Sequence, residues 1–128
     1  MKKIALLLTV FLLPSVSYAV DGNELLSNCS KAIKVSDGAE ILSSDYFGVG
    51  TCMGTIRGII DAGNIINTSA TQRCYSKQDV YCVPVEVSTV QATRVVVKYL
   101  KDHPEDLHQR DTRLIVTALT EAFPCKGK

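Results

Sequence analysis

Three glycines spaced four residues apart inside an apolar run are the feature that most constrains the fold of this chain. In a helix, Gly50, Gly54 and Gly58 would share one edge. The surrounding apolar residues recur at the three- and four-residue steps of a helix face: Val49, Cys52, Met53, Ile56, Ile59 and Ile60. Each internal glycine costs about 0.5–1 kcal/mol relative to alanine, so three of them indicate that another backbone approaches this helix closely.

The same G-x-x-x-G spacing also occurs where two helices pair inside a membrane. Here Arg57 and Asp61 interrupt the apolar run, which argues against a membrane span. We therefore predict that residues 49–61 form the central buried helix of the fold. On this interpretation Cys52 lies on the buried side and contributes one half of a disulfide.

The first 19 residues have the pattern of a secretory signal peptide. Lys2 and Lys3 precede an apolar run at residues 4–13, and residues 17–19 (Ser-Tyr-Ala) place small side chains at the two positions that signal peptidase reads. The run is shorter than the about 20 residues that a membrane span needs. No cysteine lies near the cleavage point, which disfavours a lipoprotein. We predict that residues 1–19 are cleaved and that residues 20–128 form one exported domain.

The predicted mature domain is nearly neutral. The whole chain has a formal charge of +1, and removing Lys2 and Lys3 changes it to −1 because every Asp and Glu lies beyond residue 19. This balance gives no support for binding to nucleic acid or to an anionic membrane. Tryptophan is absent and aromatic residues are few, so aliphatic side chains must fill the core.

The first half of the domain is predicted to hold two helices. The first covers about residues 23–33, with Asp21 or Asn23 as its N-cap. A turn-rich stretch follows, in which we expect a short helical turn at residues 39–42. Tyr46 and Phe47 then lead into the glycine-containing helix, and we assign both to the core rather than to a recognition patch.

The second half is predicted to hold two more helices, which makes the fold an all-α bundle of about four helices. The third helix follows a capping box formed by Ser88 and Gln91. The fourth begins near Pro104, because proline and acidic residues suit a first helical turn, and it ends before Pro124.

One long exposed loop, residues 64–80, is predicted between the two halves because the helical pattern gives way to polar residues. Loops of this length inside small domains are often functional, although a merely solvated loop is an equal alternative. Tyr75 lies between Arg73 and Lys77 and is the most attractive contact residue there.

Five cysteines follow residue 19, and an exported protein favours disulfides. No C-x-x-C pair is present, so the usual zinc and thioredoxin-like signatures are missing. A Cys29–Cys52 bridge would clip the first helix to the second, and a Cys82–Cys125 bridge would tie the start of the third helix to the end of the fourth. Cys74 is then the unpaired thiol, or it forms a competing local bridge to Cys82.

Several short motifs, taken in order, resemble those of the Rap/Tai immunity proteins of type VI secretion. They are Cys52-x-Gly54-x-Ile56-x-Gly58-x-x-Asp61, Cys82-x-Pro84, Tyr99-Leu100-x-x-His103-Pro104 and Ala122-Phe123-Pro124-Cys125. The similarity extends from about residue 25 to residue 125. It implies a small, all-helical, disulfide-containing periplasmic protein that is usually a homodimer. The implied partner is a peptidoglycan amidase effector, a papain-like cysteine hydrolase, whose active-site cleft the immunity protein blocks.

A blocking protein needs a rigid scaffold and a projecting surface, so that binding orders little new structure. The polar loop and the outer face of the third helix are the predicted projecting surfaces. We expect the effector-binding residues to be Tyr75, Lys77, Gln78, Asp79, Gln91, Arg94 and Lys98.

An enzyme and a chaperone are the alternatives from other functional classes. A thiol hydrolase would have to use Cys74 with His103 or His108, but His103 precedes a proline at a helix junction, where histidine usually caps or packs. The two histidines are five residues apart, which does not match an i, i+4 metal pair. We therefore predict no catalytic residue, no metal and no cofactor. A small periplasmic helical chaperone or stress-response binding protein is the second alternative, which the regular amphipathic helices disfavour.

Overall fold

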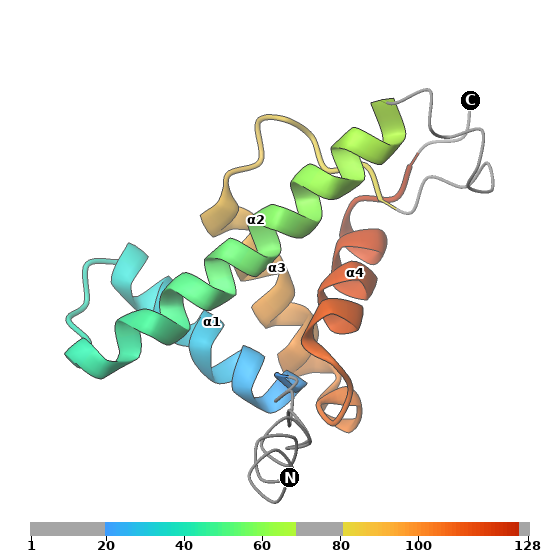
Figure 1. The fold of residues 1–128 in the computed structure, drawn as a ribbon. Helices are drawn as coiled ribbons and strands as arrows, with labels where there is room; N and C mark the ends of the chain where they lie inside the picture. Colours follow the sequence, from blue (N-terminus) through green and yellow to red (C-terminus); the bar gives the residue numbers. More distant parts are fainter. Residues whose placement is uncertain (1–19, 69–80, 126–128) are drawn as a thin grey trace, which may run out of the picture.

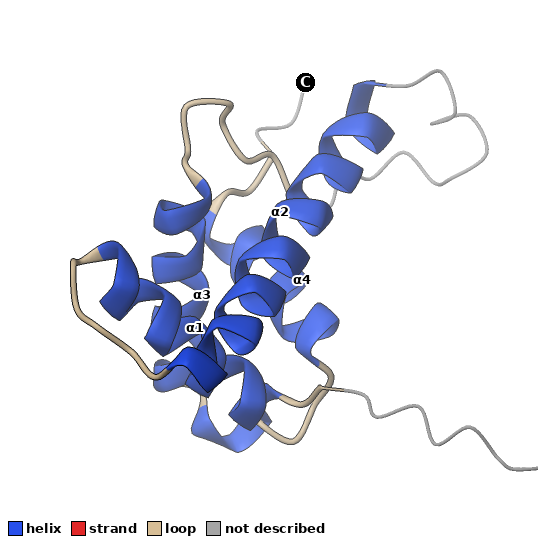
Figure 2. Ribbon diagram, turned by 60° about the vertical axis from the view of Figure 1, so that its left-hand side comes forward, coloured by secondary structure: helices blue, strands red, loops and turns tan. Residues whose placement is uncertain are grey.

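The computed structural model describes residues 20–68 and 81–125, and these ranges form a four-helix domain without a β-strand. The α-helices are α1 (Gly22–Ser36), α2 (Tyr46–Thr68), α3 (Thr89–Asp102) and α4 (Asp111–Ala122). Two short 3-10 turns, η2 (Ser43–Asp45) and η4 (Pro104–Asp106), precede α2 and follow α3. The long helix α2 runs across the other three (Figure 1), and a second view shows the all-helical arrangement (Figure 2). The predicted all-α bundle is confirmed.

Capping residues set the starts of α1 and α3, as the sequence predicted. The Asp21 carboxylate accepts a hydrogen bond from the Glu24 backbone N–H at 3.0 Å, so Asp21 rather than Asn23 is the N-cap of α1. The Ser88 hydroxyl accepts from the Gln91 backbone N–H at 3.1 Å at the start of α3. These bonds satisfy backbone donors that a helix leaves without partners in its first turn.

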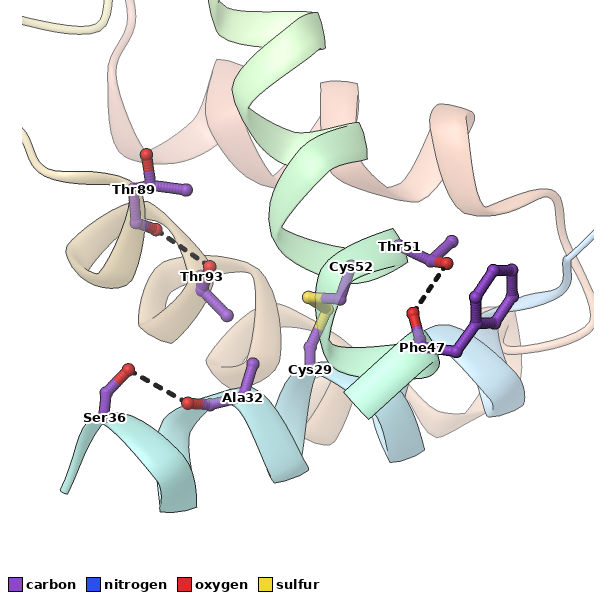
Figure 3. Close-up of a disulfide and its surroundings, with 8 residues drawn as sticks. All are labelled: Cys29, Ala32, Ser36, Phe47, Thr51, Cys52, Thr89 and Thr93. Atoms are coloured by element: carbon purple, nitrogen blue, oxygen red, sulfur yellow. Dashed lines mark hydrogen bonds between the residues drawn. A yellow bond between two sulfur atoms is a disulfide. The ribbon is translucent and has the colours of Figure 1, made fainter. Parts of the chain in front are cut away.

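The core lies where α1, α2, α3 and α4 meet. Its fully buried side chains are mostly aliphatic, as expected for a chain without tryptophan: Ile56, Leu100, Leu114, Ile115, Leu119, Val96, Thr93, Cys29 and Cys52. Thr93 is the polar member of this set. Its hydroxyl donates to the Thr89 carbonyl at 2.8 Å, which satisfies the group inside the apolar core (Figure 3).

Two disulfides staple the bundle, and both pairings agree with the predicted ones. Cys29–Cys52 joins α1 to α2 inside the core (Figure 3), where its two cysteines are 0% and 1% exposed. Cys82–Cys125 joins the segment before α3 to the segment after α4. A backbone hydrogen bond from Cys82 N–H to the Phe123 carbonyl, at 2.9 Å, supports the second staple.

Three element boundaries differ from the predictions. Residues 64–68 continue α2 instead of opening the loop, and the Asn67 side-chain amide donates to the Tyr81 carbonyl at 3.0 Å, a contact that fixes this end of the helix. The helical turn expected at residues 39–42 lies instead at Ser43–Asp45. The fourth helix starts at Asp111, not near Pro104.

Backbone pairing with the beginning of the chain explains the late start of α4. Gly22 N–H donates to the Gln109 carbonyl at 3.0 Å, and Asp111 N–H donates to the Val20 carbonyl at 3.1 Å. These two bonds pair Arg110 with Asp21 in an isolated β-bridge and hold Arg110 in an extended conformation, so the helix begins only after it. Residues 104–106, which the sequence analysis assigned to the first turn of the fourth helix, form the separate short helix η4.

Candidate functional site

Three of the predicted binding residues form a row on the exposed side of α3. Gln91, Arg94 and Lys98 occupy positions i, i+3 and i+7, which lie on one side of a helix, and all three are exposed. The Ser88 cap fixes where this row begins. The structure therefore brings these residues together on one accessible face, as the sequence predicted.

Ion pairs anchor two members of this row. The Arg94 guanidinium contacts the Asp37 carboxylate at 2.5 Å, which ties α3 to the end of α1. Lys98 pairs with Asp102 one turn further along α3, and this hydrogen bond lowers the pKa of the Asp102 carboxyl below its usual value. Exposed pairs of this kind contribute about 0–1 kcal/mol, so these side chains can exchange their present partners for those of a binding protein at little cost.

All the large, exposed apolar side chains of the described helices lie on α2. Phe47 is 86% exposed and Ile65 is 63% exposed, and eighteen residues separate them, which is a whole number of helical turns. Three of the five glycines of α2 lie between them on the same side: Gly50, Gly54 and Gly58. A Cβ atom built on any of these glycines meets nothing within 4 Å. Phe47, these three glycines and Ile65 therefore form a stripe along α2 that faces solvent.

The phase of α2 makes one prediction about this helix wrong and leaves another unmet within the described fold. The glycines do not admit another backbone within the described fold, because Cys52 and Ile56 occupy the inward side opposite them. Tyr46 and Phe47 are not core residues: they are 55% and 86% exposed, and Phe47 points away from the buried disulfide (Figure 3). Counting the helical period back from Ile56 places Phe47 on the far side, a signal that the sequence contains.

A cleft of about 260 Å³ lies between α3 and α4. Apolar side chains and charged side chains share its lining: Val95, Lys98, Tyr99, Asp102, His103, Ala118, Glu121 and Ala122. The sequence pattern did not indicate this site, because its residues come from two helices whose packing brings them together. Lys98 thus belongs both to the exposed row on α3 and to the rim of this cleft.

His103 stacks on Tyr99 at one wall of the cleft, with ring centroids 4.2 Å apart. The His103 Nδ1 atom lies 2.9 Å from the Tyr99 carbonyl oxygen, and this hydrogen bond raises the pKa of the imidazole. Nearby carboxylates, including Glu121, raise it further, while partial burial opposes the shift. Burial also raises the pKa of the Tyr99 hydroxyl.

A family model of the Rap1a immunity proteins matches residues 21–125, which include every helix described above. The chain belongs to this family. No curated protein and no solved structure matches the chain significantly. Family membership identifies an immunity protein that acts against a secreted effector, and such a protein binds its cognate effector.

The remaining predicted contact residues of this immunity protein fall outside the described residues. Tyr75, Lys77, Gln78 and Asp79 lie within residues 69–80, as does Cys74. Their role in effector binding stays a prediction. The exposed apolar side of α2 and the cleft between α3 and α4 are additional surfaces that the sequence interpretation missed.

The described part of this immunity protein offers few groups for catalysis. Its four cysteines are all in disulfides. Residues 20–68 and 81–125 contain no group of three or more metal-ligating side chains. His108 is exposed, and its Nδ1 atom lies 2.9 Å from the Glu105 carbonyl, a local turn contact. No helix within the described ranges has the length and apolar character of a membrane span.

Proposed function

We propose that this protein is a periplasmic immunity protein that binds a peptidoglycan amidase effector of type VI secretion and blocks its active site. The family match over residues 21–125 carries the proposal. Two disulfides support an oxidising compartment, and the signal-like residues 1–19 provide a route of export. The protein would thereby protect its producer against the toxin of sister cells.

The scaffold suits a blocking mechanism because its described surfaces are held in place before binding. The buried Cys29–Cys52 bridge fixes α1 against α2, and the Cys82–Cys125 bridge ties the segment before α3 to the segment after α4. A preorganised surface loses less conformational entropy on binding than one that must first be ordered. The row on α3 and the segment at residues 69–80 are the proposed contact surfaces for the effector.

Calorimetry of the oxidised protein with the product of the neighbouring gene, combined with an assay of peptidoglycan hydrolysis by that product, tests the proposal directly. We expect saturable binding with one site per enzyme and a parallel loss of peptidoglycan hydrolysis. A triple variant, Gln91→Ala, Arg94→Ala and Lys98→Ala, should weaken the affinity at least tenfold, because charged contacts in interfaces contribute the equivalent of about 1.5–3 kcal/mol each.

Lys34→Ala provides the matched control, since Lys34 is an exposed basic residue on α1, outside the α3 row. The control should leave affinity and inhibition unchanged. Binding without any inhibition would refute active-site blocking while leaving effector recognition intact. An absence of both binding and inhibition would refute the amidase assignment.

We also propose that the protein forms a homodimer through the outward side of α2. Three glycines with open space above them allow a second helix to approach closely. Each glycine lowers the stability of the helix relative to alanine, and no close contact within the described fold compensates for this loss. Large apolar side chains flank the stripe at both ends. Side chains such as Phe47, at 86% exposure, are typical anchors of protein interfaces.

The pattern along this stripe is self-complementary under a two-fold axis. If two copies of α2 cross in antiparallel orientation between Gly54 and Gly58, then Gly54 of each copy faces Gly58 of the other. The same operation places Phe47 opposite Ile65 at both ends. A C2 interface requires one surface to match itself in this way.

Light scattering coupled to gel filtration tests the dimer through Gly54→Leu. The monomer should tolerate this change because a Cβ at Gly54 meets nothing within 4 Å, whereas a close helix pair should not. We expect a monomer for Gly54→Leu and a dimer for Ser27→Leu, an exposed control position on α1. A dimer that persists in Gly54→Leu would contradict this interface.

A further inference from the structure

We propose that the cleft between α3 and α4 binds a basic side chain, arginine or lysine, presented by the cognate effector. This inference rests on the proposed function and adds the chemistry of one contact on the partner. It uses the walls of the cleft and the charges around it.

The apolar lining of the cleft suits the aliphatic stem of a basic residue. Val95 contributes from α3, and Ala118 and Ala122 contribute from α4. A volume of about 260 Å³ is enough for one long side chain but small for a folded element. Arginine and lysine bury their methylene stems on such surfaces while their charged ends remain near polar groups.

The charge around the cleft is complementary to a cation. The rim ammonium group, from Lys98, is already paired with Asp102. Glu121 lies on the opposite wall, and within the described residues no cationic side chain forms an ion pair with it. An incoming guanidinium or ammonium group can therefore pair with Glu121 without displacing an existing ion pair.

His103 supplies a second acceptor for the same cation. Its Nδ1 atom is placed to donate a hydrogen bond to the Tyr99 carbonyl. When the ring is neutral, its one N–H proton is therefore on Nδ1. The Nε2 atom of that tautomer carries a lone pair and accepts hydrogen bonds. The stacked ring of Tyr99 supports the imidazole in this orientation.

The neutral state of His103 is required, so the binding depends on pH. Carboxylates from three elements interact with this imidazole: Asp102 on α3, Glu105 and Asp106 on η4, and Glu121 on α4. Two cationic side chains lie nearby, since Lys98 lines the same cleft and Arg113 interacts with the stacked Tyr99. The Tyr99 contact and the carboxylates raise the pKa of His103 above its usual value. The basic side chain should bind above this pKa and be released as the pH falls through it, when Nε2 becomes a donor and the ring becomes cationic.

An NMR titration of the oxidised protein with N-acetyl-arginine-methylamide tests the cleft without the effector. The neutral isostere N-acetyl-citrulline-methylamide is the matched probe. We expect the arginine probe to shift the His103 ring and Ala118 methyl signals, and the citrulline probe to bind at least tenfold more weakly. Equal binding of the two probes, or no shift of these signals, would overturn the inference.

Two substitutions make the test specific to the charges named. Glu121→Gln should weaken the arginine probe about tenfold, because a hydrogen bond between two charged groups becomes one with a single charge. Glu86→Gln, an exposed control before α3, should have no effect. His103→Gln should leave a neutral acceptor and remove the loss of binding at low pH. Persistence of that pH dependence in His103→Gln would overturn the role given to His103.

The final arm compares effector affinity between the native protein and Glu121→Gln. A tenfold loss with unchanged stoichiometry supports the contact, and equal affinity overturns it. If the amidase does not bind the native protein while the arginine probe still binds the cleft, the proposed function fails and the preference for a basic side chain stands. The two failures are therefore distinguishable.

Discussion

The two sides of α2 differ in what each residue contacts. The inward side carries Cys52, Ile56 and Ile60, which are 0–5% exposed and meet the other three helices. The outward side carries glycines with open space above them, between Phe47 and Ile65. Both sides show the same three- and four-residue spacing in the sequence. The helical period thus identifies which residues share a side, and packing alone decides which side is buried.

Substitution of a large inward residue should have the largest effect on stability. Ile56→Ala removes a side chain that is 0% exposed, and we expect the free energy of unfolding to fall by about 2–5 kcal/mol through lost burial and the cavity left behind. Urea denaturation monitored by circular dichroism measures the change. The matched substitution Ile65→Ala, at an outward side chain that is 63% exposed, should change the free energy by less than about 0.5 kcal/mol. Similar losses at both positions would contradict the assignment of the two sides.

Gly63 extends the comparison to a glycine that is buried. A Cβ at this position would lie 2.3 Å from the Tyr81 ring, whose hydroxyl donates to the Ile59 carbonyl at 2.5 Å. We expect Gly63→Ala to lower the free energy of unfolding by about 1–3 kcal/mol, because the buried ring must move or lose its hydrogen bond. Thermal and urea denaturation measure this loss.

A double-mutant cycle identifies the cause of that loss. In the background Tyr81→Ala the ring is absent, so the additional change Gly63→Ala should no longer destabilise the protein. A penalty that persists without the ring would show that another contact, and not Tyr81, requires glycine at this position.

Much of the fold was predictable from local signals. Asp21 and Ser88 are short polar residues placed before apolar helical stripes, and both cap their helices. The pairing of Cys29 with Cys52 followed from their positions on two such stripes. The two capping signals depend on residues within one turn of each other, and each apolar stripe is read within one helix, so a sequence contains them.

The features that were missed depend on contacts between distant segments. Asn67 is a polar residue that suggested a loop, but the hydrogen bond that its side-chain amide donates to the Tyr81 carbonyl accompanies the continuation of α2. The start of α4 depends on backbone bonds to residues 20 and 22. The cleft beside His103 exists only because α3 and α4 pack together, so no spacing within either helix could indicate it.

The smallest expected effect, and the sharpest test of the comparison, comes from alanine at an outward glycine. Gly54→Ala adds a Cβ that meets nothing within 4 Å, so it removes backbone freedom from the unfolded chain without a new clash. We expect the free energy of unfolding to rise by about 0.5–1 kcal/mol, opposite in sign to Gly63→Ala in the same helix. Urea denaturation at low protein concentration measures the effect on the monomer. A loss of stability there would mean that the outward side is already occupied within one chain, whereas a loss confined to high concentration would locate the cost in the proposed α2 pairing of two copies.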